Sequence, residues 1–283
     1  MGFINEIVQT LLYTGMVEGI KPVSGLLVGP SGGGKSQTLI PYKAPWIHHT
    51  NDLTSAGLSD ILSNDVSGKL RTIILPDFNV PLSHKSAVVT LTVSNLLSLM
   101  SEGTCRIDDG RNQKIMKHEP MSIVSGLTPE MYTQHFKKWK ALGFIRRFLM
   151  VNFVYSLETR RDGSAQIREG KVTSENLPDI VIDKTKEGTL KKVKLEKREA
   201  GDIEILSMEL ATNLGYNLMR DGKTHKIKWV EQERALEFAP HLMLQSIAKG
   251  NALRMHRNRV NQSDIKFLIR LLGFTNPARP QSI

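Results

Sequence analysis

The chain is poor in cysteine, in aromatic residues and in long apolar runs, and these shortages exclude several classes of protein. Its 283 residues include 1 cysteine, Cys105, so a scaffold held by intramolecular disulfides is excluded. No apolar run approaches the roughly 20 residues that a membrane-spanning helix needs. No charged leader with a following apolar segment opens the chain. We therefore expect a soluble protein of the cytoplasm with no membrane partner.

The residues that are present have the balance of an ordinary globular protein. Hydrophobic residues make up 40% and charged residues 23% of the chain, which excludes general disorder. The formal net charge is +10. Residues 1–100 carry equal numbers of basic and acidic side chains, so the surplus lies in residues 101–283. A surplus of this sign favours a polyanionic partner such as nucleic acid.

Short apolar runs separated by helix-length segments predict an α/β fold. Buried parallel strands are typically continuous apolar runs of this kind, with helices covering both faces of the sheet. The segment 83–100 is predicted to be one of those helices, although its β-branched residues lower helix propensity. The predicted strands are residues 24–28, 72–75, 121–125 and 148–154.

Changes in composition divide the chain into three predicted parts. Residues 1–157 fit one α/β core, and residues 158–200 form a charged connector rich in turn formers. Residues 201–283 have helical spacing and predict a small helical domain. Within the last two parts we expect strand-like stretches at 180–182 and 193–195, a helix through Leu236, Ala239, Met243 and Ile247, and a final helix from Ser263 to Gly273.

The most specific motif is a glycine-rich loop between the first predicted strand and a predicted helix. Its residues match the pattern G-x-x-x-x-G-K-[ST], in which backbone N–H groups surround phosphate oxygens. Lys35 is expected to reach the β and γ phosphates, and Ser36 to ligate Mg²⁺. A merely flexible turn is the alternative, which the Lys-Ser pair disfavours. The predicted cofactors are ATP and Mg²⁺, bound by Gly29, Pro30, Ser31, Gly32, Gly33, Gly34, Lys35, Ser36 and Gln37.

Asp77 ends the second predicted strand, where P-loop proteins place a carboxylate that holds Mg²⁺. The alternative is an ordinary acidic residue at a strand end. The next residue is Phe78 and not the Glu with which many hydrolytic P-loop proteins polarise the attacking water. Glu102 is the nearest downstream acid, and nothing in the sequence assigns it as a base. Nucleotide binding is therefore expected more firmly than hydrolysis.

The order of these motifs resembles that of AAA+ ATPases, in particular the clade of the minichromosome-maintenance helicases. The likeness rests on the loop and on residues 73–78, 100–112, 122–129 and 144–148. It implies a P-loop core with a small C-terminal helical lid, and ATP bound between the subunits of a ring or filament.

The same resemblance implies roles for individual residues. Asp77 takes the place of the Walker B carboxylate, and Thr128, or alternatively Ser125, that of sensor 1. Arg147, with Arg146 beside it, matches the arginine finger. The alternative for this pair is that it solvates a strand end or meets an acidic neighbour. No arginine occupies the expected sensor 2 position near residues 239–241.

A basic hairpin is predicted before the third strand. Arg106, Arg111, Lys114 and Lys117 flank an Asp-Asp-Gly turn signal, and the resemblance implies that such a hairpin contacts the nucleic-acid backbone. The alternative is a solvated hairpin or one that contacts protein. Elsewhere, Trp139 among lysines is expected to pack inward, with stacking on a base as the alternative. The basic segment 184–198 is expected to be a solvated connector, with a nucleic-acid or protein contact as the alternative.

Together these expectations describe an AAA+ ATPase that binds Mg-ATP at subunit interfaces and acts on DNA or a DNA-bound protein, as a helicase-like motor, a loader or a remodeller. A nucleotide-gated assembly scaffold with little hydrolysis is the first alternative, favoured by Phe78 and the missing sensor 2 arginine. The second alternative is a chelatase-like protein remodeller, in which the basic surplus serves solubility.

Overall fold

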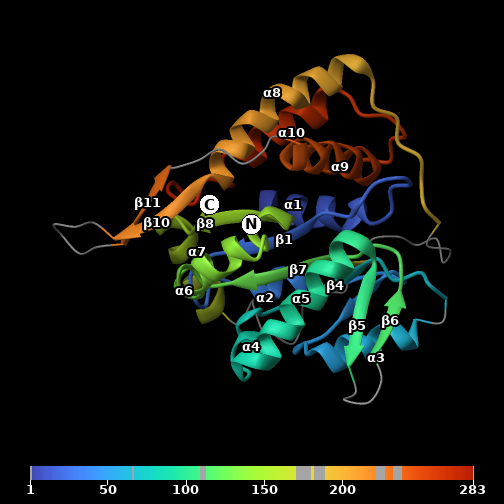
Figure 1. The fold of residues 1–283 in the computed structure, drawn as a ribbon. Helices are drawn as coiled ribbons and strands as arrows, with labels where there is room; N and C mark the ends of the chain where they lie inside the picture. Colours follow the sequence, from blue (N-terminus) through green and yellow to red (C-terminus); the bar gives the residue numbers. More distant parts are fainter. Residues whose placement is uncertain are drawn as a thin grey trace.

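A six-stranded sheet forms the centre of the computed structural model (Figure 1). The structure describes residues 2–65, 67–108, 113–169, 180–181, 189–220, 227–231 and 238–282. The strand order is β12-β8-β1-β7-β4-β3, and every neighbouring pair is parallel. The strands are β1 (Ser24–Val28), β3 (Ile47–His49), β4 (Thr72–Leu75), β7 (Ser122–Leu127), β8 (Phe148–Val154) and β12 (Gln281–Ser282).

This order determines which residues meet at one edge of the sheet. The carboxyl ends of parallel strands lie on the same edge. β7 runs between β1 and β4, so the segments that follow these three strands are neighbours. The glycine-rich loop follows β1, Asp77 follows β4 and Thr128 follows β7. Residues far apart in the sequence therefore come together around the loop.

Both faces of the sheet are buried, and successive side chains alternate between two hydrophobic clusters. Leu27 of β1 belongs to the cluster on the side of α1, whereas Leu26 and Val28 belong to the cluster on the opposite side. Alternation of two apolar faces explains why these strands appear as continuous apolar runs. The helices on the first side are α1 (Gly2–Thr14), α8 (Lys197–Leu214), α9 (Phe238–Arg254) and α10 (Gln262–Leu272); those on the second are α3 (Ser55–Asn64), α5 (Ser86–Glu102) and α6 (Pro129–Ala141).

The C-terminal helices are joined to the core through α1. In Figure 1 α9 lies directly over α1, and α8 and α10 lie above. A Cβ at Gly250 of α9 would be 2.8 Å from the Thr10 carbonyl oxygen of α1, so the two helices pack closely. Buried polar contacts reinforce this packing, because the Asn251 side chain bonds both Thr10 and Asp264.

Several expectations about the core are confirmed. The runs 24–28, 72–75 and 148–154 are β1, β4 and β8, and the run at 121–125 is β7, shifted to 122–127. The predicted helix 83–100 is α5, preceded by the short α4 (Asn79–Leu82). α10 begins after an Asn261 capping box and ends at Gly273, as expected. The remaining short helices are α2 (Lys35–Leu39), η1 (Ile145–Arg147) and α7 (Leu157–Arg168).

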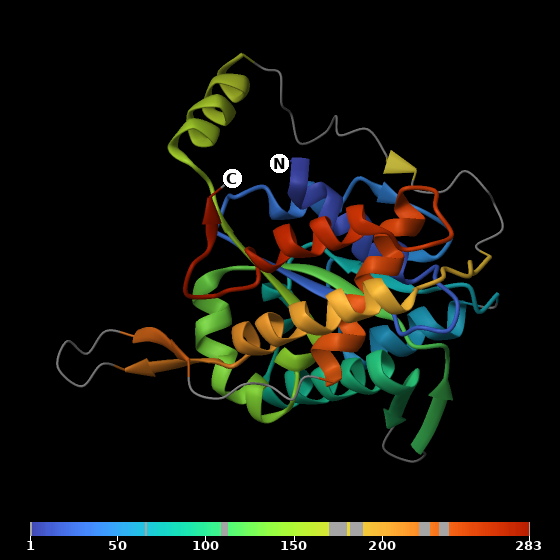
Figure 2. The same cartoon turned by 90° about the horizontal axis from the view of Figure 1, so that it is seen from above.

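Two expectations about the later parts are wrong. Residues 193–195 form no strand, since this segment makes only isolated bridges, from Lys191 to Val17 and from Lys194 to Arg259. The part from residue 201 is not purely helical. It contains the antiparallel pair β10 (Tyr216–Arg220) and β11 (Ile227–Glu231), which extends from the body in Figure 2, and its β12 joins the central sheet beside β8.

The connector also differs from its prediction. Residues 157–168 form α7, and α8 begins already at Lys197. Of the expected stretch 180–182, residues 180–181 form β9 (Ile180–Val181), which pairs with β2 (Tyr42–Lys43). Residue 182 and Leu236 lie outside the described residues. Among the helices of the described ranges, none is long and apolar enough to cross a membrane.

Candidate nucleotide-binding site

Glycine is required at three positions of the loop that follows β1. Gly32 and Gly34 have φ of 68° and 66°, a left-handed conformation that favours glycine. The Gly33 N–H donates to the Pro30 carbonyl at 3.1 Å, and a Cβ on Gly33 would approach that oxygen to 2.8 Å. The loop is therefore tightly turned and has no room for larger residues at its centre.

Lys35 is turned back onto its own loop. Its Nζ donates to the carbonyl oxygens of Gly29 at 2.8 Å and Pro30 at 2.7 Å. Burial lowers the pKa of Lys35, while the nearby carboxylates of Asp77 and Glu130 act in the opposite direction. The ammonium group is thus held at the loop beside two acids.

Two oxygen-bearing side chains lie where β4 ends. The Ser36 hydroxyl donates to the Pro76 carbonyl at 3.3 Å, one residue before Asp77. The half-buried Asp77 accepts the Asn79 N–H at 2.9 Å. A hydroxyl and a carboxylate are ligands that Mg²⁺ prefers. The donor set therefore fits the predicted metal ion.

The end of β7 packs against both the loop and β4. A Cβ on Gly126 would lie 2.8 Å from the Pro76 carbonyl oxygen and 3.1 Å from the Lys35 Cβ. The Gly126 carbonyl accepts the Phe78 N–H at 2.8 Å. Any side chain at position 126 would push Lys35 and β4 apart.

The two sensor candidates occupy different places. Ser125 is buried within β7 and donates its hydroxyl to the Leu75 carbonyl at 2.5 Å. Thr128 is half-buried at the edge of the sheet and caps α6, where its Oγ1 accepts the Met131 N–H at 3.4 Å. Of the two, Thr128 is the one that lies beyond the strand end, next to the loop.

Phe78 points into the core and not towards the loop. It is 1% exposed, and its ring centroid lies 6.0 Å from that of Trp139 and 5.8 Å from that of Phe144. A carboxylate at this position would be buried among aromatic rings. The missing Glu is therefore explained by packing.

The two arginines of the candidate finger lie at the opposite end of α6 from Thr128. Arg147 donates from Nε to Ser101 Oγ at 2.6 Å and from Nη1 to the Gly143 carbonyl at 3.0 Å. Burial lowers the pKa of Arg147, and Arg146 adds to this effect while Glu102 opposes it. Arg146 is exposed. Arg147 directly precedes β8, which runs parallel to β1, so both arginines lie at the amino ends of these strands, at the opposite edge of the sheet from the loop of their own chain.

The predicted basic hairpin is present as β5 (Thr104–Asp108) and β6 (Gln113–Lys117), an antiparallel pair that pairs Arg106 with Ile115. Arg106 and Lys117 are exposed, and so is Ile115 at 63%. Arg111 and the side chain of Lys114 lie outside the described residues. The hairpin therefore presents two described cations together with an apolar residue.

Asn95 of α5 fixes this hairpin to the body. Its amide nitrogen donates to the Arg106 carbonyl at 2.8 Å, and its Oδ1 accepts the Arg106 N–H at 3.2 Å. The amide also donates to Ser55 Oγ of α3 at 2.6 Å. The strand that carries Arg106 is thus held by a buried side chain at both backbone groups.

The inward packing of Trp139 is confirmed, because it is 1% exposed while Lys137, Lys138 and Lys140 are exposed.

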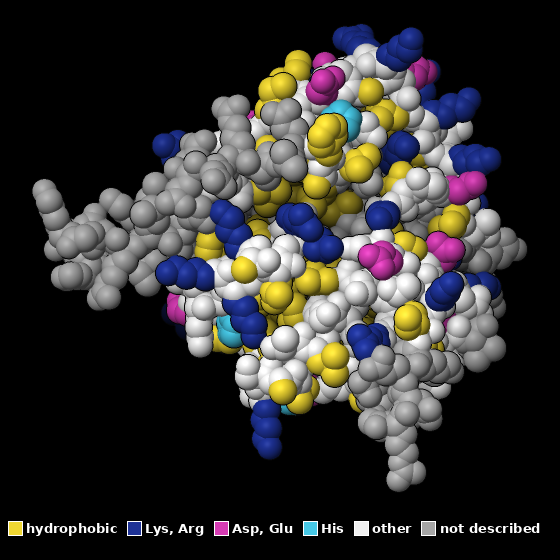
Figure 3. Space-filling view, in the orientation of Figure 1, with side chains coloured by type: hydrophobic (Ala, Val, Ile, Leu, Met, Phe, Trp, Pro, Cys, Tyr) yellow, Lys and Arg dark blue, Asp and Glu magenta, His cyan; other side chains and the backbone are white. Residues whose placement is uncertain are grey.

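Figure 3 shows more Lys and Arg than Asp and Glu on the face it presents. In the described part of the basic connector, the backbone of Lys191 forms an isolated β-bridge with Val17, and that of Lys194 forms one with Arg259.

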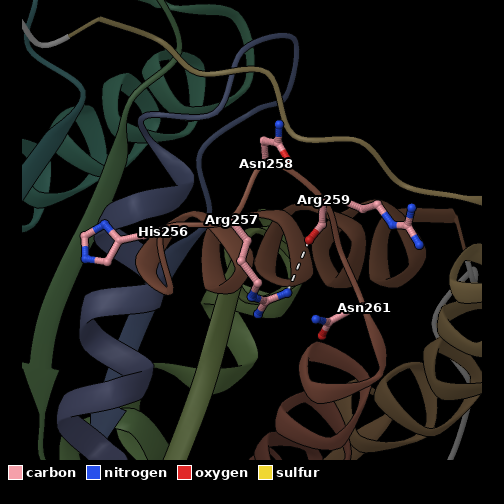
Figure 4. A pocket seen from close by; sticks show the side chains of 5 residues that line it. All are labelled: His256, Arg257, Asn258, Arg259 and Asn261. Atoms are coloured by element: carbon pink, nitrogen blue, oxygen red, sulfur yellow. Dashed lines mark hydrogen bonds between the residues drawn. The ribbon is translucent and has the colours of Figure 1, made fainter.

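A hollow at the turn between α9 and α10 is lined by two arginines, and each arginine is paired with an acidic side chain. Arg257 makes two 2.8 Å hydrogen bonds to the buried Asp264, and Arg259 pairs with Glu196 at 3.0 Å. Figure 4 shows the lining side chains pointing in different directions. This hollow contains none of the predicted nucleotide residues; its lining residues are His256, Arg257, Asn258, Arg259 and Asn261.

Two residues near the loop carry no recognisable sequence motif. Tyr155 hydrogen bonds through its hydroxyl to the Gly33 carbonyl, and its ring would lie 3.1 Å from a Cβ on Gly33. Tyr155 comes there because β8 pairs with β1, with Asn152 opposite Val28. Glu130 is the other residue; it lies in the first turn of α6, after the end of β7, and its carboxylate favours the charged form of Lys35 and so raises the pKa of Lys35.

Comparison with known proteins adds no relative: no family model matches the chain, and no curated protein matches it. What the site can do is therefore judged from its own residues, which are a glycine-rich loop, a lysine and two oxygen ligands at one edge of a parallel sheet.

Proposed function

We propose that this chain is an AAA+ P-loop ATPase, similar to the minichromosome-maintenance clade, that binds Mg-ATP between identical subunits and acts on DNA or on a DNA-bound protein. The observation that carries the proposal is the convergence of the loop 29–36 with Asp77, since Ser36 bonds the residue before Asp77. Motif and three-dimensional placement agree, which is the context the motif requires.

In this proposal each residue of the site has a defined task. The N–H groups of residues 29–36 and the ammonium of Lys35 bind the phosphates, and Gln37 follows at the start of α2. Ser36 and Asp77 hold Mg²⁺, which neutralises phosphate charge when it is bound. Thr128 contacts the terminal phosphate from the adjacent strand end. Lys35 must first leave the carbonyls of Gly29 and Pro30.

The arginine at the subunit interface is Arg146 in preference to Arg147. Arg147 already bonds Ser101 and Gly143, whereas Arg146 is exposed. Because Arg146 lies at the opposite edge of the sheet from the loop of its own chain, Arg146 would act on the nucleotide of a neighbouring subunit. An arginine supplied in this way stabilises the charge that develops on the γ-phosphoryl group.

The proposed DNA contact is the β5–β6 hairpin with Arg106 and Lys117. Contacts between such cations and phosphate are independent of sequence and weaken as salt rises. The net charge of +10 supports a polyanionic partner in general terms.

A nucleotide-gated scaffold remains the second candidate, because Phe78 is buried and no carboxylate follows Asp77 directly. A chelatase-like remodeller of proteins is the third, in which the basic surplus does not bind DNA. These candidates share the nucleotide site and differ in turnover and in DNA binding.

The test is ATP turnover by the purified protein with and without single-stranded and double-stranded DNA, at low and moderate salt, with Lys35→Ala as the blank. DNA-stimulated turnover supports a DNA-directed ATPase. ATP binding without turnover in all conditions supports the scaffold. Turnover that DNA does not change, together with no salt-dependent DNA binding, supports the protein remodeller.

A further inference from the structure

Resting on the proposed ATPase function, we propose that Glu130 is the general base that activates the attacking water in ATP hydrolysis. The need for such a residue follows from Phe78. The position that directly follows Asp77 is filled by a side chain packed between Trp139 and Phe144, so the base must come from another element.

The path of the chain brings Glu130 to the loop. β7 ends beside Lys35, where Gly126 is so close that a Cβ would lie 3.1 Å from the Lys35 Cβ. Thr128 then caps α6, and Glu130 lies in the first turn of that helix. The Glu130 carboxylate is close enough to Lys35 to favour its charged form, as Asp77 also does. Glu130 thus shares with Asp77 the neighbourhood of the phosphate-binding lysine.

Glu130 is also available for this task. Its side chain is exposed, and among the described residues no ion pair joins it to a cation. Asp77 is assigned to Mg²⁺. Glu102 lies at the end of α5 beside Arg147, at the other end of α6 from the loop. Of the acids weighed, Glu130 alone combines proximity to Lys35 with an unassigned carboxylate.

The step balances without a further reactant. The oxygen of a water molecule forms a bond to the γ phosphorus of ATP, and the bond from that phosphorus to the β–γ bridging oxygen breaks with its electron pair leaving on ADP. Glu130 accepts a proton from the water as the new bond forms, and releases it to phosphate or solvent afterwards. The products are ADP and inorganic phosphate.

The experiment compares Glu130→Gln with Glu102→Gln in the full chain. Both changes remove one negative charge from a helix-end glutamate, and only the first lies near the loop. For each variant we would measure the Kd of a fluorescent ATP analogue, steady-state turnover and its dependence on pH. General bases contribute about 100-fold to 10,000-fold in rate. We expect Glu130→Gln to keep ATP affinity within about twofold and to lose turnover by at least about 100-fold, with Glu102→Gln near the wild type.

The outcomes distinguish failure of the general base from failure of the proposed ATPase function. Turnover by Glu130→Gln above about a hundredth of the wild-type rate would overturn the assignment of the base and leave the ATPase standing. A loss of ATP affinity equal to the loss of turnover would make Glu130 a binding residue and also overturn it. Wild-type protein that binds ATP without hydrolysing it would refute hydrolysis itself, and failure to bind ATP would refute the nucleotide site.

Discussion

At the scale of single residues, the most informative side chain is Lys35, which in this structure bonds two carbonyl oxygens of its own loop. The same ammonium cannot satisfy these carbonyls and reach the phosphates without moving. In the proposed function, binding of a polyphosphate would therefore exchange the neutral acceptors of Lys35 for charged ones, and charge-assisted hydrogen bonds are the stronger kind.

We expect Lys35→Ala to weaken ATP binding by about 30-fold or more, because truncating a partially buried charge that pairs with another charge costs about 2 kcal/mol or more. The measurement is the Kd of a fluorescent ATP analogue. Lys43→Ala, which removes an exposed lysine on β2, is the matched control. Unchanged affinity in Lys35→Ala would refute the assignment of the phosphate loop.

Substitution of Arg146 and of Arg147 should affect different properties, turnover for Arg146 and thermal stability for Arg147. Arg146→Ala is expected to lower turnover by about 1,000-fold with little change in Tm, since a finger arginine is worth at least that in rate. Arg147→Ala should lower Tm, because it leaves Ser101 and the Gly143 carbonyl without their donor.

Mixing tests whether Arg146 acts across a subunit interface. An Arg146→Ala chain supplies an intact Asp77 site, and an Asp77→Ala chain supplies an intact Arg146. The mixture should regain part of the wild-type turnover that neither variant has alone. If no mixing ratio restores activity, the shared site is wrong.

Sequence reasoning identified the residues of the loop because glycines, lysine and serine are adjacent in the chain and their spacing is itself the signal. It did not identify Glu130 and Tyr155, since each reaches the loop only through strand pairing. Likewise, Phe78 points inward because its ring packs against those of Trp139 and Phe144. These residues are far from Phe78 in the sequence, so no local pattern indicates this contact.

At the scale of elements, the base of the basic hairpin is held by a part-buried hydrogen bond between His118 and Asp65. His118, just after β6, lies 2.8 Å from Asp65, just after α3. Burial opposes ionisation of Asp65, but hydrogen bonds from His118, Ser67 and the N–H groups of Leu70 and Lys69 outweigh it and lower its pKa below 3.8. The carboxylate form is thus favoured by folding.

A pKa lower in the folded than in the unfolded chain gives a defined pH dependence. The stabilisation from Asp65 is present above its unfolded pKa near 3.8 and is lost as pH falls through the lower folded pKa. We expect Asp65→Asn to reduce the decline of the unfolding free energy between about pH 5 and about pH 2.5. Urea titrations at several pH values measure it, with the exposed Asp60 changed to Asn as control. An equal acid dependence in wild type and Asp65→Asn would contradict the argument.

The elements that could be predicted are those whose burial is complete. β1, β4 and β8 bury both faces, so their apolar runs have the bounds of the strands. β3 is only partly buried and contains His48 and His49, so it has no such run. α7 is polar along most of its length, and α8 begins within a run of charges, so the composition of this region indicated a connector.

At the scale of the whole molecule, the C-terminal helices and the sheet share one hydrophobic cluster. Leu27, Ile7, Ile247 and Leu268 all belong to it. The predicted boundary near residue 200 is therefore not a boundary in packing. A continuous core favours a single cooperative unfolding transition.

A substitution of Asp264 tests whether the chain unfolds in one cooperative transition. Asp264 is 0% exposed and accepts hydrogen bonds from both Arg257 and Asn251. Removing one partner of a buried ion pair costs about 3 kcal/mol or more. We expect Asp264→Ala to lower the free energy of unfolding by about that amount, with far-ultraviolet dichroism and tryptophan fluorescence still changing together. Lys266→Ala, an exposed position on the same helix, should change it by less than about 0.5 kcal/mol. Separate transitions by the two probes would show independent domains.

The length of α6 has one further consequence. If its two ends serve two different nucleotides, every subunit carries two half-sites, and an open row of subunits always ends with one unmatched half at each end. A closed ring leaves none. The specific ATPase activity would then be low in dilute protein, where few half-sites are matched. It would rise with protein concentration as rows lengthen, and it would become constant once rings have closed.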